Sequence, residues 1–298
     1  MKKKIPPFCG SAAALVTPFT CSGKVDFDAL GRMIEFQISS GTDALVFLGT
    51  TGESPSVTES ERSEIIAFAV NRVKKRVPVI VGTGTNVTET TQENCREAAK
   101  LGADALLAVT PYYSKASAEG LTEHFTRAAS SADVPLILYT VPSRTGVNIP
   151  IEVYEKLAKI DNITAVKEAS GNIAAVSDLC RRFGDSLFVY SGNDEMTLPV
   201  IAVGGLGVIS AAANIAPRMM HDLCRHALDG EISKARKLQH RLDPLIAALF
   251  SEVNPIPVKC ACDMMGLCGE TMRLPLCPMG EEKRVLLENE IKKLVLFP

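Results

Sequence analysis

The sequence predicts an α/β protein, a (β/α)8 TIM barrel with a C-terminal helical extension. Two observations carry this prediction. Short apolar runs recur along the chain with helical patterns between them, and no linker-like segment divides the series. The runs are continuously apolar instead of alternating, which is typical of parallel strands buried on both faces. A doubly wound open sheet is the alternative that the same pattern allows.

The predicted strands are the eight apolar runs, which cover residues 11–19, 43–50, 77–84, 104–113, 134–142, 163–170, 187–193 and 205–212. The segments between them carry helix signals. Residues 57–73 contain Thr58 followed by Glu61, the spacing of a capping box, ahead of apolar residues at helical intervals. Residues 117–129 and 150–160 have the same periodicity. We therefore expect a helix in each of these segments.

Only helical patterns remain after residue 215. They run through residues 218–250 and 280–297, and together they exceed what one closing barrel helix needs. We therefore expect a catalytic barrel over residues 1–215 and a helical region packed on it over residues 216–298.

The composition bounds the partners of the chain. With 298 residues, 46% of them hydrophobic and 22% charged, the chain can bury a sizeable core. The net charge of −2 offers no electrostatic case for binding nucleic acid or an anionic membrane. No apolar run approaches the roughly 18 to 20 residues of a membrane span, and the start lacks the apolar core of a signal peptide. We expect a cytoplasmic protein.

Neither the cysteines nor the glycines indicate a metal or a cofactor. Nine scattered cysteines, an odd number, argue against a disulfide scaffold. Cys260, Cys262, Cys268 and Cys277 invite a zinc interpretation but lack paired C-x2-C spacings, so buried thiols are expected instead. The stretches "GTGTNV" and "GGLGVI" fail the spacing of phosphate loops, and close backbone approach at strand ends explains them better. We expect no cofactor.

Polar residues gather where the predicted strands end. The segments "GTTGES", "PYYS", "YTVPSRTG" and "KEAS" follow or close the second, fourth, fifth and sixth runs. In a (β/α)8 barrel, catalytic groups project from the C-terminal ends of the strands and from the loops just after them. This clustering is the strongest indication of a catalytic site in the sequence.

Lys167 stands inside the sixth run, "ITAVKEAS". One interpretation is a strand end at which Lys167 and Glu168 reach solvent, and the other is a nucleophile. Adjacent strand residues point to opposite faces, so Lys167 shares its face with Ala165 and Ala169, which leave room for a substrate. Taking an unpaired ammonium out of water is costly, and the neutral amine is the form that Schiff-base chemistry needs.

Taken together, the motifs resemble the pyruvate-dependent class I aldolase superfamily and, within it, the dihydrodipicolinate synthase family. The resemblance runs nearly end to end, through "GTTGES", "VTPYY", "VPSRTG", "VKEASGN", "SGND" and "NPIPVK". It implies a Schiff-base lyase that condenses pyruvate with aspartate 4-semialdehyde to 4-hydroxy-tetrahydrodipicolinate, in diaminopimelate and lysine biosynthesis. It also implies a homo-oligomer, a tetramer built as a dimer of dimers.

The resemblance assigns the catalytic roles. Lys167 would condense with the ketone of pyruvate, and Tyr139 would act beside it as the general acid and base. Thr51 and Tyr113 match the family's proton-relay partners, with Tyr113 arriving from a neighbouring subunit. The family commonly has asparagine after the fifth-strand tyrosine; Thr140 stands there in this chain and weakens a local hydrogen-bond expectation.

The resemblance also assigns the substrate contacts. Thr50, Thr51, Gly192 and the Ile209 backbone would line the pyruvate pocket, and Arg144 would offer a planar fork to a substrate carboxylate. The nearest alternative is an N-acetylneuraminate lyase or a keto-deoxy sugar-acid aldolase. Arg144 discriminates against it, because an arginine suits a short acidic substrate better than a polyol. A non-catalytic binding barrel is the other alternative, which the complete catalytic set disfavours.

Part of the family is inhibited by lysine at a subunit interface, and there the sequence departs from the pattern. Thr90 stands where a glutamate carboxylate would meet the ammonium of lysine, and Glu59 and Arg62 replace histidines. The resemblance therefore predicts weak or absent inhibition by lysine.

Overall fold

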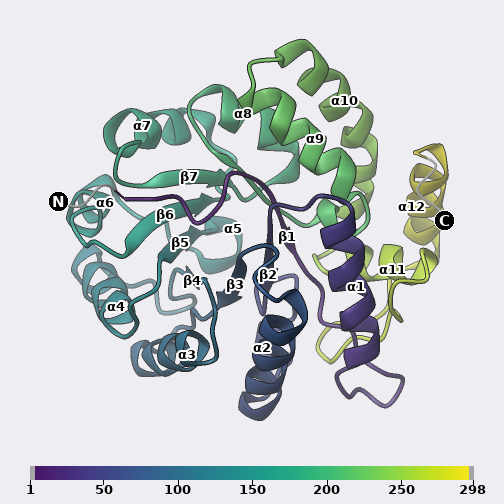
Figure 1. Ribbon diagram of the computed structural model, residues 1–298, viewed down its shortest axis with the longest axis horizontal. Helices are drawn as coiled ribbons and strands as arrows, with labels where there is room; N and C mark the ends of the chain where they lie inside the picture. Colours follow the sequence, from purple (N-terminus) through teal and green to yellow (C-terminus); the bar gives the residue numbers. More distant parts are fainter. Residues whose placement is uncertain (1–3, 295–298) are drawn as a thin grey trace.

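The computed structural model describes residues 4–294 and contains a closed barrel of eight parallel strands (Figure 1). Each strand pairs with the next along the chain, and the first pairs with the last to close the ring. The strands are β1 (Gly10–Ala14), β2 (Ala44–Phe47), β3 (Val79–Gly82), β4 (Ala105–Val109), β5 (Leu136–Thr140), β6 (Ile163–Glu168), β7 (Phe188–Ser191) and β8 (Gly207–Ser210). The predicted TIM barrel is confirmed, and the open sheet is excluded.

All eight strands end earlier than the apolar runs that predicted them. β1 ends at Ala14 although its run extends to residue 19, and β4 ends at Val109 although its run extends to residue 113. The apolar residues beyond these ends leave the barrel wall and begin the loops at its C-terminal face. That face therefore receives the polar motifs.

Helices surround the barrel and continue past it. They are α1 (Phe27–Ser39), α2 (Glu59–Val73), α3 (Thr88–Lys100), α4 (Ala118–Ser130), α5 (Pro142–Thr145), α6 (Ile151–Leu157), α7 (Ile173–Phe183), α8 (Thr197–Ala202), α9 (Pro217–Leu228), α10 (Ile232–Leu249), α11 (Ile256–Met264) and α12 (Glu281–Lys293). The helix α9 lies against β1 and β8, and α10 packs on α9. Figure 1 shows α11 and α12 on the same side as α10, which both contact.

The core has two layers, as strands buried on both faces require. One layer fills the barrel and consists largely of small or medium side chains, among them Ala12, Ala44 and Ala165. The other lies between the strands and the helices. At the N-terminal end of the barrel, Phe8 stacks on Tyr190 with ring centroids 4.2 Å apart.

Local sequence signals appear in the structure as predicted. At the start of α2, Thr58 Oγ1 accepts from the Glu61 amide at 3.3 Å and the Glu61 carboxylate accepts from the Thr58 amide at 2.9 Å, which completes the capping box. A Cβ at Gly82 would lie 2.1 Å from the Leu48 carbonyl oxygen, and one at Gly84 would lie 2.3 Å from the Val109 amide nitrogen. The predicted close backbone approach is confirmed.

The nine cysteines are all free thiols. Cys260, Cys262 and Cys268 are buried, whereas Cys277 is exposed. Within residues 4–294, no three histidine, cysteine or acidic side chains are grouped to hold a metal ion. None of the helices in this range combines the length and apolar character needed to cross a membrane.

Candidate active site

Lys167 and Tyr139 face each other across neighbouring strands. The two residues are register partners in β6 and β5, and Lys167 Nζ lies 4.4 Å from the centre of the Tyr139 ring. The exposed fractions are only 7% for Lys167 and 6% for Tyr139, so the interpretation of Lys167 as a solvated strand end is wrong. Ala165 and Ala169 pack in the barrel interior together with Tyr139. Within residues 4–294, no carboxylate forms an ion pair with the Lys167 amine.

Glu168 points to the other face of β6, as the strand period requires. It is buried, and burial raises the pKa of its carboxyl group although the Ser170 amide donates to it at 3.0 Å. Its register partner is Thr140, whose hydroxyl is buried without a hydrogen-bond partner among the described residues. Thr140, the residue at which the sequence departs from the family's asparagine, thus makes no hydrogen bond through its hydroxyl to the described residues.

Thr50 and Thr51 lie in a tight turn after β2. The Gly52 amide donates to the Gly49 carbonyl and the Glu53 amide to the Thr50 carbonyl, both at 3.1 Å. This turn buries Thr51 and leaves Thr50 partly exposed. The Thr51 hydroxyl accepts a hydrogen bond at 3.0 Å from the side chain of Asn254.

Arg144 belongs to α5, a single helical turn, instead of the loop that we expected. Pro142 begins this turn and Gly146 ends it with a φ of 70°, in the left-handed region that favours glycine. The guanidinium is exposed, and its Nη2 donates to the Asn254 carbonyl at 3.0 Å.

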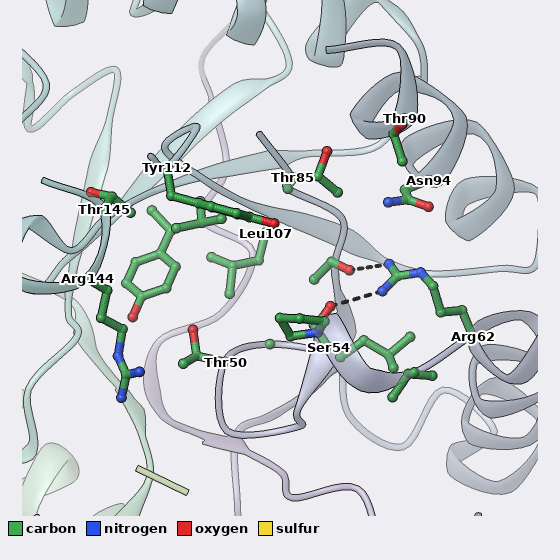
Figure 2. A pocket seen from close by; sticks show the side chains of 18 of the residues that line it. Thr50, Ser54, Arg62, Thr85, Thr90, Asn94, Leu107, Tyr112, Arg144 and Thr145 are labelled. Carbon is green, nitrogen blue, oxygen red and sulfur yellow. Dashed lines mark hydrogen bonds between the residues drawn. The ribbon is translucent and has the colours of Figure 1, made fainter. Parts of the chain in front are cut away.

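A pocket of about 670 Å³ opens beside these residues. Thr50, Tyr139 and Arg144 contribute to its wall, so it reaches the catalytic end of the barrel. Figure 2 shows that Arg144 lies towards one end of the pocket and Arg62 towards the other, with Thr50 between them. The pocket therefore joins the mouth of the barrel to a second region beside α2 and α3.

The second region contains the three residues at which the sequence departs from the lysine-inhibited pattern. Glu59, Arg62 and Thr90 all line it. Arg62 donates to Ser54 Oγ at 3.0 Å and to the Gly82 carbonyl at 2.7 Å (Figure 2), and burial lowers its pKa. Its guanidinium is therefore held against the wall of the pocket.

Three further predicted residues differ in their exposure. Tyr113 follows β4, is 90% exposed and has a φ of 74°, which turns the chain outward. Ile209 is buried in β8 beside Ala12 of β1. The Gly192 amide donates to the Glu168 carbonyl at 2.6 Å. The roles predicted for these three residues stay predictions.

The model of the dihydrodipicolinate synthetase family matches residues 7–294. The chain belongs to this family. The 4-hydroxy-tetrahydrodipicolinate synthase of Lachnoclostridium phytofermentans is 49% identical over 291 residues, which are 97% of this chain and 99% of the relative. The predicted resemblance and the predicted enzyme class are confirmed.

Solved structures of the family have the same fold. The dihydrodipicolinate synthase of Aquifex aeolicus is 44% identical with a TM-score of 0.95, over 97% of this chain and 99% of that one. The chloride-inhibited enzyme of Acinetobacter baumannii, solved in complex with pyruvate, is 39% identical with a TM-score of 0.95, over 97% and 99%. The matches favour the synthase over the sugar-acid aldolases.

Sequence reasoning missed a group of residues after α10 that bind the "GTTGE" turn which follows β2. Lys259 Nζ lies 2.5 Å from Glu53 Oε1, and both side chains are buried. The Arg273 amide donates to the other Glu53 oxygen at 3.3 Å. Asn254 and Lys259 belong to "NPIPVK", a motif that supported the resemblance without suggesting a role. The signal was an apolar segment that nevertheless contains a lysine, the same signal that identified Lys167.

Proposed function

We propose that this enzyme condenses pyruvate with aspartate 4-semialdehyde through a Schiff base on Lys167. The observation that carries the proposal is a buried primary amine at the C-terminal end of the barrel, 4.4 Å from the centre of the Tyr139 ring and without a counterion among residues 4–294. An amine in such surroundings is held out of water and is free to attack a carbonyl carbon. The pyruvate complex of the Acinetobacter baumannii enzyme supports the choice of the first substrate.

The steps follow from carbonyl chemistry. Lys167 Nζ attacks the ketone carbon of pyruvate, and water leaves as the imine forms. Loss of a methyl proton gives an enamine, whose carbon attacks the aldehyde carbon of the second substrate while the aldehyde oxygen takes up a proton. The amino group of that substrate then attacks the imine carbon and displaces Lys167, which closes the ring of 4-hydroxy-tetrahydrodipicolinate.

Tyr139 is suited to move the protons of these steps, since it is a phenol whose ring centre lies 4.4 Å from the amine. Thr51 and Tyr113 extend the relay in this proposal. Because Tyr113 is 90% exposed, it requires a neighbouring copy of the chain to enter a site. A homo-oligomer, with a two-fold dimer as its unit and a tetramer as its full assembly, therefore belongs to the proposal, as does a cytoplasmic location.

Borohydride reduction tests the proposal. Incubation with pyruvate and borohydride should add one reduced pyruvyl mass at Lys167 and inactivate the enzyme, whereas borohydride alone should do neither. Addition at another lysine, or no addition, would refute the mechanism. A subsequent comparison of aspartate 4-semialdehyde with sugar aldehydes as acceptors tests the second substrate, because a preference for the sugars would favour the alternative aldolase.

A further inference from the structure

We propose that Thr145 is a positioning residue for this reaction, which holds Arg144 in place beside Tyr139. The inference rests on the proposed function, in which Arg144 binds a carboxylate of the second substrate. Thr145 and Arg144 both belong to α5, the single helical turn after β5, and both line the pocket (Figure 2). Thr145 is only 4% exposed, whereas Arg144 is exposed.

The turn α5 closes its own hydrogen bonds but needs outside contacts to fix its place. The Val141 carbonyl accepts from the Arg144 amide at 2.9 Å and from the Thr145 amide at 3.0 Å. The Pro142 carbonyl accepts from the Gly146 amide at 2.9 Å. A helix of one turn has little stability of its own. The direction in which α5 presents Arg144 therefore depends on what holds the turn against the barrel.

The Thr145 hydroxyl makes contacts where α5 begins and where it ends. Its Oγ1 lies 3.2 Å from the Val141 carbonyl oxygen before the turn and 3.2 Å from the Val147 carbonyl oxygen after it. It also accepts from the Val147 amide at 3.3 Å, and Thr110 Oγ1 lies 3.1 Å away. A threonine hydroxyl has one proton, so it donates to one of the two carbonyls at a time. Whichever carbonyl accepts that proton, the bond fixes the chain at an end of α5.

Thr110 connects this hydroxyl to the strand that carries Tyr139. Thr110 follows β4 and is fully buried. Its amide donates to the Tyr139 carbonyl at 2.9 Å, while its hydroxyl contacts that of Thr145. At the far end of the Arg144 side chain, Nη2 donates to the main-chain carbonyl of Asn254 at 3.0 Å. The guanidinium and the backbone of Arg144 are thus held separately, and the two threonines hold the backbone relative to Tyr139.

Packing alone does not explain the Thr145 hydroxyl. Valine has nearly the same shape as threonine and would not bury a polar group, which is unfavourable unless the group is hydrogen-bonded. The barrel also contains Thr164, whose buried hydroxyl has no hydrogen-bond partner among residues 4–294. The Thr145 hydroxyl differs from it, because its polar contacts join α5 to Thr110 and to the chain at both ends of the turn. The placement of α5 is therefore the better explanation.

The test is Thr145→Val, which keeps the shape of the side chain and removes the hydroxyl. We expect the KM for aspartate 4-semialdehyde to rise by about tenfold, within the range of roughly ten- to a hundredfold for complete loss of the Arg144 contact. Borohydride trapping of pyruvate at Lys167 should keep a rate within about twofold of native. General damage to the mouth of the barrel would slow both steps, so the difference between them separates the positioning of Arg144 from a purely structural role.

Three further variants make the outcome decisive. Thr145→Ser keeps the hydroxyl and should have a KM within about twofold of native. Thr164→Val removes a buried hydroxyl that has no partner within residues 4–294, and it should have native kinetics. In an Arg144→Ala background, Thr145→Val should change the KM by less than about twofold, because the group that it positions is absent.

The inference is overturned if Thr145→Val leaves the KM for the semialdehyde within about twofold of native, or if it slows the trapping of pyruvate to the same extent. An effect that persists in full without the Arg144 guanidinium, or that Thr145→Ser shares, also overturns it. If Thr145→Val does not fold by circular dichroism, Thr110→Val decides in its place by the same criteria. Trapping with the native enzyme separates the two levels. No addition of pyruvate at Lys167 refutes the proposed function, whereas normal trapping with an unaffected Thr145→Val refutes only the role of Thr145.

Discussion

Two lysines among residues 4–294 are buried, and within this range only one of them has a counterion. Lys259 Nζ lies 2.5 Å from a Glu53 oxygen and 4.2 Å from the centre of the Phe19 ring. Lys167 Nζ lies 4.4 Å from the centre of the Tyr139 ring and has no carboxylate partner among residues 4–294. Both amines are thus placed over an aromatic face, and the difference between them is the acid.

The difference explains why burial alone does not make a lysine a nucleophile. Burial lowers the pKa of Lys259, but the Glu53 carboxylate opposes that change by favouring the ammonium. An ammonium held by a carboxylate has no lone pair with which to attack a carbonyl. Lys259 therefore holds the turn that carries Thr51 through its ion pair with Glu53, and Lys167 is the proposed nucleophile.

The largest expected effect on activity comes from removing the two lysines in turn. Lys167→Ala should lower kcat by at least about a thousandfold, because it removes the nucleophile itself. Pyruvate and borohydride should then add no mass to the protein. In Lys259→Met the addition at Lys167 should persist. Trapping at Lys259 in the Lys167→Ala variant would show that the counterion does not make the difference.

The second effect concerns stability. Lys259→Met leaves the Glu53 carboxylate buried and unpaired, which should lower the free energy of unfolding by about 3 to 5 kcal/mol. The double variant Lys259→Met with Glu53→Gln should recover part of this loss, and thermal unfolding measures both. The matched control is Lys234→Ala, since Lys234 pairs with Glu231 at the surface and should contribute less than about 1 kcal/mol. Equal unfolding midpoints for Lys259→Met and the native chain would contradict the prediction.

His124 is another buried basic side chain, and it extends the comparison to the dependence of stability on pH. Burial lowers the pKa of His124 to about 4, and nearby Glu89 opposes the shift only partly. Its Nδ1 lies 3.0 Å from Thr88 Oγ1, a neutral partner. The folded-state pKa is below the unfolded value near 6.5, so the unfolded chain binds the proton first as pH falls. The stability from the neutral ring is complete above about pH 6.5 and is lost towards pH 4, by up to roughly 3 kcal/mol.

We therefore expect His124→Gln to lose less thermal stability than the native enzyme between pH 7 and pH 4. The exposed His240 supplies the control, and His240→Gln should keep the native dependence on pH. If the thermal stability of the native enzyme and of His124→Gln fell equally between pH 7 and pH 4, the lowered pKa of His124 would not be the cause of the loss.

A smaller effect is expected from Arg144, an exposed cation whose proposed partner is a carboxylate of the substrate. Arg144→Ala should raise the KM for aspartate 4-semialdehyde by about ten- to a hundredfold, since a charge-assisted hydrogen bond contributes about 1.5 to 3 kcal/mol. Imine formation with pyruvate should be unchanged. Native kinetics with the semialdehyde would refute the role, and slower trapping of pyruvate would move Arg144 to the first step.

The smallest expected effect is that of free lysine on the activity of the native enzyme. Its ammonium would meet Thr90, a weaker partner than the carboxylate that Lys259 has in Glu53. The lost charge-assisted bond corresponds to about ten- to a hundredfold in affinity. We expect little or no inhibition at millimolar lysine in a steady-state titration, and increased inhibition in Thr90→Glu. Strong partial inhibition of the native enzyme below about one millimolar would overturn this expectation.

The comparison of the two lysines also shows what the sequence could predict. Lys167 could be singled out because strand periodicity and small neighbouring residues are visible in a short stretch of sequence. Tyr139 lies opposite Lys167 once β5 and β6 pair in register. Lys259 and Asn254 meet Glu53 and Thr51 across more than 200 residues of chain, a separation that no local pattern encodes. Arg144 was assigned to a loop because a single helical turn is too short to have a periodicity. The proposed role of Tyr113 depends on a second copy of the chain, which no pattern within a single sequence encodes.

The stacked rings of Phe8 and Tyr190 have a consequence for the order of events. They are buried at the N-terminal end of the barrel, and the Tyr190 hydroxyl donates to the Phe8 carbonyl at 2.5 Å, so these two side chains fill space at that end. In the proposed mechanism, both substrates therefore enter from the C-terminal face of the barrel, where Thr50, Tyr139 and Arg144 line the pocket. In this mechanism, an aldehyde substrate bound first would obstruct the approach of pyruvate to Lys167. Pyruvate already bonded to Lys167 would leave the rest of the pocket open to the aldehyde. The proposed imine at Lys167 therefore implies a fixed order of binding, with pyruvate first and aspartate 4-semialdehyde second.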